Sequence, residues 1–583
     1  MVRSVIVVAV ILLAFVAGGC DDLRDVSESA VSLPTEPTRV DLFLGAPELI
    51  RGLDARSFEV RDDALAIAPW AESATKARAA RVITNVIDLG GEADISLPTL
   101  ITDLHVRTFG RTPGRGRIVT WLRHGSTYFQ PADWTDWQVI SSLTGPQKSA
   151  PSTQLDLGDD CYVQFCADVA GEKGQPGQPA PTLGGLAVSF VRQSRQRFEP
   201  PIEVPSAGLE RIVRSTISFD YGRPDQPDLL WLRKNCRLDD LVAKPKDEFA
   251  RVIALNDWVS RRPAKLWSPV ATLGDELSPW DLHKTFDLAN GGTVSGGSAG
   301  YCRLFVAAAT ALGWPARQIV ANSVDGSSRD LVEVWIDKAS QWVCFVPYLG
   351  AYYVDPAGQP LCAIDARDAA EDCFRDGSAT QPGMDAISRQ LDNWLATTLP
   401  ADVTVSSPAL RIPPIRVSTN GIAFGKAAEQ TRQAALDVLH GDFLWMIPHS
   451  RFGPASAQRV GPAVPCWLPA ETEDLLPTMP STLNPKPGDP TCLWTRRRAD
   501  WNWTLNQAAM KLVRTGPRQI TVELGNSQPF FSKYIALIDG RAQQVGSKFV
   551  WRLSRGSNTL IVTCLDEFNR DGIPSSIRVQ LGK

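Results

Sequence analysis

Two side chains that can act as nucleophiles, Ser298 and Cys302, stand near the start of an alanine-rich segment in the middle of the chain. The pattern predicts a helix over residues 299–312, because Gly313 and Pro315 form a normal C-terminal stop signal. Positive partial charge at a helix N-terminus favours a thiolate, and a serine there needs a positioned base. A serine or thiolate nucleophile at this place would be suited to acyl transfer or hydrolysis.

Three patterns after this helix resemble the scaffold of a transglutaminase-like domain, which has the papain-type cysteine protease fold. They are Gly-Trp-Pro-Ala-Arg at 313–317, Leu-Val-Glu-Val-Trp at 331–335 and Trp-Val-Cys-Phe-Val-Pro at 342–347. The resemblance covers residues 231–364 and implies a triad of cysteine, histidine and aspartate. By the family spacing, the triad positions are fifteen residues before Gly313, four before Glu333 and four after Trp342, which are Ser298, Arg329 and Val346.

None of these three positions keeps the residue type that the resemblance implies. Arginine stays protonated and cannot act as a general base, and valine cannot accept a proton from an imidazole. Loss of one triad member already leaves a residual rate of only about 10³ to 10⁴ over water. The sequence therefore predicts a pseudoenzyme with no catalytic residues, which binds a peptide or glycan ligand, or a partner, without turning it over.

Each of these residues also has a structural interpretation. Ser298 suits a helix N-cap, and Arg329 is either a solvated loop residue or a contact for an anionic ligand in the old cleft. Cys302 lies one helical turn too late for the nucleophile, so core packing or a disulfide is expected. Conceivable disulfides are Cys302 with Cys344, Cys362 with Cys373, and Cys466 with Cys492.

Two other functions stay open at this point. In the first, the protein is a hydrolase or acyl-transferase with Ser298 as nucleophile and a base from elsewhere, such as His283. In the second, the protein is an architectural component of the cell envelope. A carboxylate behind a histidine at Ser298 would favour the enzyme, whereas a hydrophobic or salt-bridged floor would favour the pseudoenzyme.

The N-terminus predicts the compartment. Arg3 precedes an apolar run at 5–16, and Ala-Gly-Gly-Cys at 17–20 resembles the lipobox of a bacterial lipoprotein. This implies lipidation of Cys20 and a membrane-anchored, extracytoplasmic protein, and Asp21 resembles an inner-membrane retention signal. An ordinary secretory signal peptide and an uncleaved anchor are the alternatives.

Composition excludes several classes of partner. The 583 residues carry a formal net charge of −4 and no basic tract, so no nucleic-acid binding is expected. The five histidines lack metal-ligand spacing, and the eleven cysteines contain no Cys-x-x-Cys pair. We expect no metal and no other cofactor.

The expected fold is a multidomain α+β protein. The predicted order is a signal peptide (1–20), a tether (21–38), a jelly-roll-like β-sandwich (39–198), the transglutaminase-like α+β domain (205–395) and a C-terminal region (400–583) that ends in an immunoglobulin-like β-sandwich. Trp134 and Trp137 in the first sandwich are possible sugar-stacking platforms, although tryptophans in such modules more often close the core.

Overall fold

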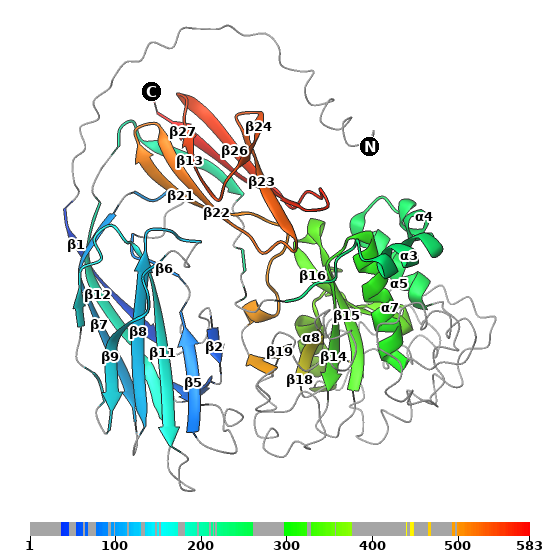
Figure 1. Ribbon diagram of the computed structural model, residues 1–583, viewed down its shortest axis with the longest axis horizontal. Coiled ribbons are helices and arrows are strands. Elements are labelled where there is room, and N and C mark those ends of the chain that lie inside the picture. The colour runs from blue at the N-terminus through cyan, green and yellow to red at the C-terminus, as the bar shows by residue number, and fades with distance from the viewer. Residues whose placement is uncertain are drawn as a thin grey trace.

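The structure is a computed structural model of the chain. It describes residues 36–260, 297–375, 439, 443–447, 464–467, 492–495 and 498–582, apart from short interruptions of which 46–53, 68–76 and 173–180 are the longest. The described chain is mostly antiparallel β-sheet with few helices (Figure 1). The predicted signal peptide, Cys20 and nearly all of the tether lie outside the described residues. No helix among the described residues is long and apolar enough to cross a membrane.

The N-terminal part consists of two six-stranded sheets that share one hydrophobic core. The first contains β1 (Thr38–Gly45), β3 (Phe58–Arg61), β4 (Ala64–Ile67), β7 (Thr99–Arg111), β10 (Thr153–Leu155) and β12 (Thr182–Ser194). The second contains β2 (Asp54–Arg56), β5 (Ala77–Ile83), β6 (Ile87–Asp88), β8 (Arg117–Gly125), β9 (Gln138–Thr144) and β11 (Tyr162–Glu172).

Alternating side chains explain why these strands form a two-layered body. Along β7, Leu104, Val106 and Thr108 are buried while Arg107 is exposed, so one face of the strand lies on the core. The sequence predicts strands at 104–108, 117–121, 161–165 and 185–190, which are separated by turn residues, and β7, β8, β11 and β12 confirm them. Two sheets around a single core are the arrangement of a β-sandwich.

A seven-stranded sheet forms the centre of the second body. Its order is β17 (Ala351–Tyr352), β16 (Gln341–Val346), β15 (Ser328–Ile336), β14 (Ala316–Asn322), β18 (Phe443–Ile447), β19 (Val464–Trp467) and β20 (Cys492–Thr495). The sequence predicts a hairpin of 331–336 and 341–346 around residues 337–340, and it is confirmed, because β15 pairs with β16 across the 3-10 turn η4 (Asp337–Ala339). A second 3-10 turn, η5 (Pro347–Leu349), follows β16.

Helices cover this sheet. They are α3 (Pro227–Asn235), α4 (Leu238–Ala243), α5 (Glu248–Ser260), α7 (Gly297–Leu312) and α8 (Ala363–Arg375). Helix α7 packs against β14 and β15, and α3 and α5 pack against α7 (Figure 1). Helical spacing of apolar residues in the sequence also predicts a helix over 247–259, and α5 and α7 confirm this helix and the one expected at 299–312.

The C-terminal part also has two sheets around one core. One contains β13 (Ile202–Gly208), β27 (Ser575–Leu581), β26 (Gly556–Asp566), β23 (Phe531–Ile538) and β24 (Arg541–Val545), and the other contains β21 (Ala509–Gly516), β22 (Gln519–Gly525) and β25 (Lys548–Arg552). A 3-10 turn, η8 (Arg498–Asp500), precedes β21.

The sheets do not follow the linear boundaries expected from the sequence. Strand β13 spans the expected boundary at 205, yet it pairs with β27 at the other end of the chain. Strands β18, β19 and β20 come from beyond residue 400, yet they extend the central sheet through the pairing of β18 with β14. Long-range strand pairing therefore joins segments that the sequence assigned to different domains.

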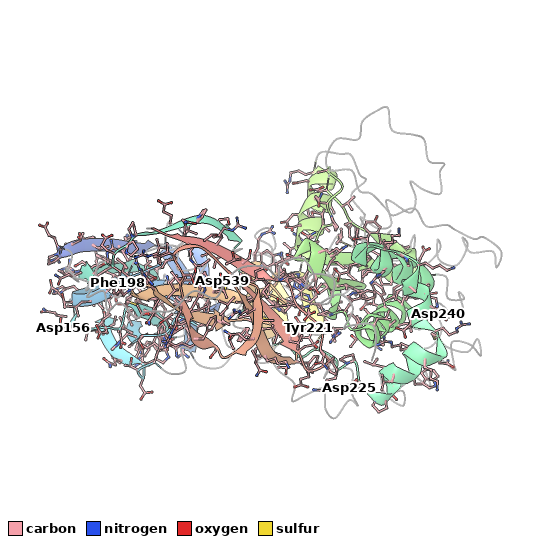
Figure 2. All side chains as sticks on the ribbon, turned by 90° about the horizontal axis from the view of Figure 1, so that it is seen from above. Asp156, Phe198, Tyr221, Asp225, Asp240 and Asp539 are labelled. Carbon is pink, nitrogen blue, oxygen red and sulfur yellow. The ribbon has the colours of Figure 1, made fainter. Side chains whose placement is uncertain are left out.

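The C-terminal body contacts both other bodies. Lys511 forms an ion pair of 2.5 Å with Asp88 of the N-terminal body. On the other side, Arg223, which precedes α3, bonds Glu567 at 2.9 Å. In Figure 2, Tyr221 lies between the C-terminal strands and the helices, while Asp156 and Asp240 lie toward opposite ends of the molecule.

Candidate functional site

The position of the family nucleophile lies at the start of α7. The helix begins at Gly297, so Ser298 is in its first turn, and its side chain lies outside the described part of the chain. The backbone N–H groups of a first helical turn have no partner within the helix and carry partial positive charge. The sequence thus places a hydroxyl residue at the end of the helix where the family has its thiol.

Cys302 lies one turn further along α7 and has no solvent exposure. Burial raises the pKa of its thiol well above the usual value, and the charges of Asp330 and Cys344 raise it further. A thiol in this state is neutral and inaccessible, so the expected core packing is confirmed. The conceivable disulfides of Cys302 with Cys344 and of Cys362 with Cys373 do not form, because Cys302, Cys344 and Cys362 are free thiols. The side chain of Cys492, the expected partner of Cys466, lies outside the described residues.

The histidine position is held by Arg329 in β15, where it pairs with Ala321 of β14. Its side chain is half-buried, so the expectation of a solvated loop residue was wrong. The neighbouring Asp330 is buried and accepts a hydrogen bond of 2.5 Å from Gln318 Nε2. The antiparallel pairing of β14 with β15 is what draws this segment into the sheet.

The aspartate position is held by Val346, the last residue of β16, which has no solvent exposure. Tyr348 beyond it is also buried, and burial raises the pKa of its phenol. The floor near the start of α7 therefore consists of apolar and buried groups together with the charges of Arg303, Arg329 and Asp330.

The described histidines lie elsewhere. His105 Nε2 is 2.7 Å from Asp103, and His124 Nδ1 is 2.6 Å from Asp160, both in the N-terminal body. His283, the base of the serine-enzyme alternative, lies outside the described residues. Within the part of residues 205–395 that the structure describes, no imidazole accompanies Ser298.

The arginine and glutamate of the family-like patterns have a structural role that the sequence did not reveal. Arg317 is buried with its guanidinium 3.8 Å from the ring centre of Trp342 and 4.6 Å from that of Trp503. The Trp342 indole donates to Trp503 O at 3.1 Å, which ties residues 501–503 to the sheet. The only signal in the sequence was the two-residue period of both strands. In the pairing of β14 with β15, Arg317 lies opposite Glu333.

The candidate sugar platforms have different environments. Trp134 is 8% exposed, and its indole donates to Thr127 O at 2.7 Å, so it closes the core and is not an exposed platform. Trp137 is half-buried, with the Arg123 guanidinium 4.7 Å from its ring centre. The structural interpretation of Trp134 is thereby correct, and Arg123 covers a face of Trp137.

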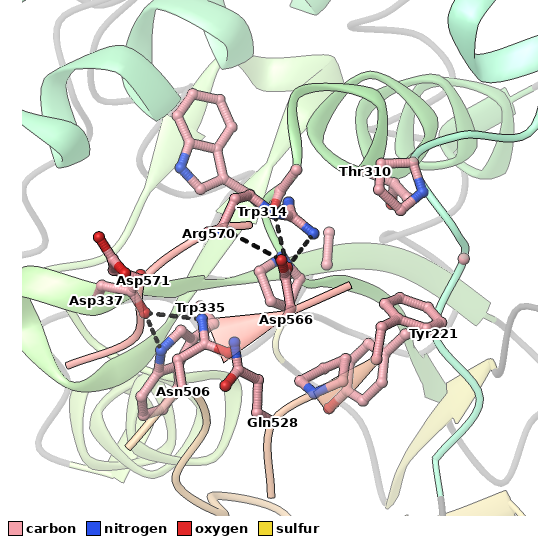
Figure 3. Close-up of a pocket in the computed structure, with 17 residues that line it drawn as sticks. Tyr221, Thr310, Trp314, Trp335, Asp337, Asn506, Gln528, Asp566, Arg570 and Asp571 are labelled. Carbon is pink, nitrogen blue, oxygen red and sulfur yellow. Dashed lines mark hydrogen bonds and ion pairs between the residues drawn. The ribbon is translucent and has the colours of Figure 1, made fainter. Parts of the chain in front are cut away.

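A pocket lies at the opposite end of α7, between the central sheet and the C-terminal body (Figure 3). Its cavity volume is about 60 Å³. On one side, Asp337 Oδ1 accepts hydrogen bonds from the Trp335 indole at 2.8 Å and from Asn506 Nδ2 at 2.9 Å. On the other side, Arg570 bonds Asp566 at 2.8 Å and also donates to Gly313 O. Sequence reasoning missed this pocket because its two walls are more than 150 residues apart in the chain.

A second cavity of about 270 Å³ lies nearby and shares Trp335 with the first. Cys362 lines it, donating to Asp365 at 3.0 Å and accepting from Asn502 at 3.1 Å. Burial raises the pKa of the Cys362 thiol, and the nearby charges of Glu333 and Asp365 raise it further. This thiol is therefore a neutral hydrogen-bonding group, not a nucleophile.

No cluster of histidine, cysteine, aspartate and glutamate that could hold a metal ion occurs among the described residues. No protein-family model and no curated protein match the chain. Among solved structures, a candidate cysteine protease from Cytophaga hutchinsonii is similar at 10% identity and a TM-score of 0.16, covering 43% of this chain and 77% of that one. Red sea bream transglutaminase is similar at 10% identity and a TM-score of 0.18, covering 87% of this chain and 95% of that one. Similarities at TM-scores this low carry no inference about fold, activity or substrate.

Proposed function

We propose that this chain is a lipid-anchored, extracytoplasmic protein whose transglutaminase-like central domain binds a peptide or glycan without turning it over. The observation that carries the proposal is Val346, which occupies the aspartate position and has no solvent exposure. An acid at that position would orient and charge-stabilise a catalytic imidazole. A buried valine can do neither.

Two further observations support loss of turnover. Cys302 is fully buried with a raised pKa, so it does not replace the missing nucleophile. An arginine side chain does not act as a general base, so Arg329 cannot take a proton from Ser298. The residues near the start of α7 are thus apolar or charged and include no described histidine. This composition supports a domain without catalytic activity.

The position of Ser298 in the first turn of α7 favours one alternative, a hydrolase or acyl-transferase with a serine nucleophile. A serine needs a base, and the described residues of the central domain offer no imidazole. The alternative therefore depends on His283 or another group outside the described residues.

The decisive experiment compares the mature protein with Ser298→Ala in assays of hydrolysis and amine transfer on glutamine peptides and cell-wall stem peptides. Ser260→Ala is a matched control, since its hydroxyl bonds only Asp257 O, at 2.9 Å, at the end of α5. We expect no turnover from any of the three proteins. Turnover by the mature protein and the control, lost in Ser298→Ala, would overturn the proposal and make Ser298 the nucleophile.

The membrane anchor rests on residues 1–20 and has its own test. Expression of the chain with Cys20→Ser should abolish lipid attachment and move the protein out of the membrane fraction. Mass spectrometry of the mature N-terminus measures the lipid directly. An unmodified Cys20 in the wild-type protein would mean that the protein is not a lipoprotein. It would then carry either an ordinary secretory signal peptide or an uncleaved anchor.

A further inference from the structure

The pocket of Figure 3 is separate from the family cleft. Helix α7 has 16 residues. At 1.5 Å per residue its two ends are roughly 24 Å apart. Ser298 lies in the first turn, whereas Thr310 and Trp314 at the other end line the pocket. A ligand here would not compete with one bound near Ser298, so binding in this pocket is independent of whether the central domain turns anything over.

Two side chains in the pocket have an oxygen atom that accepts no hydrogen bond from the described residues. Asp337 Oδ1 receives both hydrogen bonds of that carboxylate, and Oδ2 receives none from the described residues. Gln528 is 8% exposed, and its side-chain oxygen Oε1 is buried without a hydrogen-bond partner in the described chain. A buried acceptor left unsatisfied costs about 1–3 kcal/mol, which a donor group of a ligand would recover.

The charges of the pocket favour a cation. Three carboxylates and one guanidinium line it, namely Asp337, Asp566, Asp571 and Arg570. Arg570 is already paired with Asp566 at 2.8 Å, and neither Asp337 nor Asp571 forms an ion pair with any described residue. The C-terminal end of α7 also faces this space, and a helix C-terminus carries partial negative charge.

Aromatic rings complete the lining. Trp314, Trp335 and Tyr221 surround the polar groups (Figure 3). Aromatic faces attract cations by about 0.5–2 kcal/mol, more when the cation is desolvated. The carboxylate, the amide oxygen and the rings together form a half-buried site for a positive group that donates several hydrogen bonds.

We infer that this pocket binds a primary ammonium group, such as the side-chain amine of a lysine-like residue in a larger ligand, with Asp337 as counter-ion and Gln528 Oε1 as second acceptor. An ammonium group is a compact charge with three donors, which fits a cavity of about 60 Å³. A guanidinium is planar and larger, and a carboxylate would meet three like charges. The remainder of the ligand lies outside, across the junction of the two bodies.

The test is a titration with the amide of N-acetyl-lysine, followed by tryptophan fluorescence and calorimetry. The amides of N-acetyl-arginine and of the uncharged N-acetyl-norleucine serve as probes of shape and charge. We expect saturable binding of the lysine compound, weaker binding of the arginine compound and none of the norleucine compound. Binding of all three alike, or of none, would overturn the inference.

Variants locate the binding. Asp337→Asn keeps an oxygen that can accept from Trp335 and Asn506 but removes the charge, so affinity should fall about 10- to 100-fold. Gln528→Leu should weaken binding about 2- to 10-fold. Asp240→Asn is the matched control, because Asp240 is exposed on α4, far from the pocket (Figure 2), and binding should not change. Unchanged affinity in Asp337→Asn would exclude the pocket as the site. If Asp337→Asn fails to fold, as judged by circular dichroism, unchanged affinity in Gln528→Leu would do the same.

Discussion

Arg317 Nη2 lies 2.7 Å from Glu333 Oε2, and neither side chain has any solvent exposure. Arg317 Nη2 also donates to Trp501 O at 2.6 Å, while Glu333 Oε1 accepts from Ala363 N at 2.6 Å. The pair therefore connects four segments, which are β14, β15, the start of α8 and the chain after η8. In the family-like patterns these two residues therefore hold the scaffold together.

Loss of one partner of this pair should strongly lower the free energy of unfolding of the central body. Glu333→Gln leaves a buried arginine without its counter-ion, which costs about 3–5 kcal/mol of unfolding free energy. Urea unfolding followed by tryptophan fluorescence measures the loss, because Trp342 and Trp503 pack on the guanidinium. The exposed pair of Arg237 and Asp240 is the control, and Asp240→Asn should cost about 0–1 kcal/mol.

The double variant Arg317→Met with Glu333→Gln should lose less stability than the sum of its two single variants, because no unpaired charge remains buried. Additive losses would mean that the two residues act separately and that the ion pair is not what couples the four segments.

Gly313 ends α7 with a φ of +94°, and a Cβ at this position would collide with the Arg570 guanidinium. Gly358 has a φ of +83° and open space around it. Alanine at either position incurs the cost of a left-handed backbone, about 1 kcal/mol, but only Gly313→Ala also displaces Arg570. We expect Gly313→Ala to cost about 1–3 kcal/mol more than Gly358→Ala.

Equal losses for the two glycine variants would show that Arg570 is not held against the end of α7. Thermal melts of both variants, recorded in the same buffer, provide the comparison.

Cys302 should resist alkylation in the native protein. Its thiol has no exposure, and burial raises its pKa, so both access and thiolate formation are suppressed. Cys236 after α3 is half-buried and is the comparison. Mass spectrometry after iodoacetamide treatment should find Cys236 modified at least about 100-fold faster, since labelling of Cys302 requires local opening of about 3 kcal/mol or more. Rapid labelling of Cys302 in native protein would restore it as a candidate nucleophile.

The stability of the protein should depend on pH through Asp337. Burial raises the pKa of this carboxyl above its usual value, an effect that hydrogen bonds from Asn506 and Trp335 partly offset. A carboxyl with a higher pKa in the folded state contributes stability that is complete below the unfolded pKa of about 3.9 and is lost as pH rises through the folded pKa. Asp337→Asn has no such loss, so its melting temperature relative to wild type should increase from pH 4 to pH 7.

Glu248 is present in both proteins, and burial is the largest cause of its raised pKa, so most of its contribution cancels in this comparison. A relative melting temperature that stays constant or falls over this range would mean that Asp337 is ionised at no cost in the folded protein.

Local patterns in the sequence determined many of the elements. The stop at Gly313 and Pro315 predicted the end of α7, and short strand-like runs separated by turn residues predicted β7, β8, β11 and β12. These features depend on periodicity and on the backbone preferences of single residues, which act over a few positions. The burial of Cys302 followed from its helical spacing in the same way.

The sequence and the tertiary structure each determined part of what is found at the three triad positions. The sequence alone placed arginine at 329 and valine at 346, the positions where the resemblance implies histidine and aspartate. Only the tertiary structure placed Arg329 on a strand and removed Val346 from solvent, because the pairing of β14, β15 and β16 determines which face each residue occupies.

Pairing between distant segments was decided by the tertiary structure alone. The sequence carries no local mark that β13 joins β27, that β18 joins β14, or that Asp337 and Gln528 share a pocket. Strand edges accept any partner with suitable register and a matching apolar face, so the choice among partners depends on the packing of the whole chain. The sequence by itself determined many of the elements, and the global packing of apolar faces determined which elements meet and where the pocket of Asp337 and Gln528 lies.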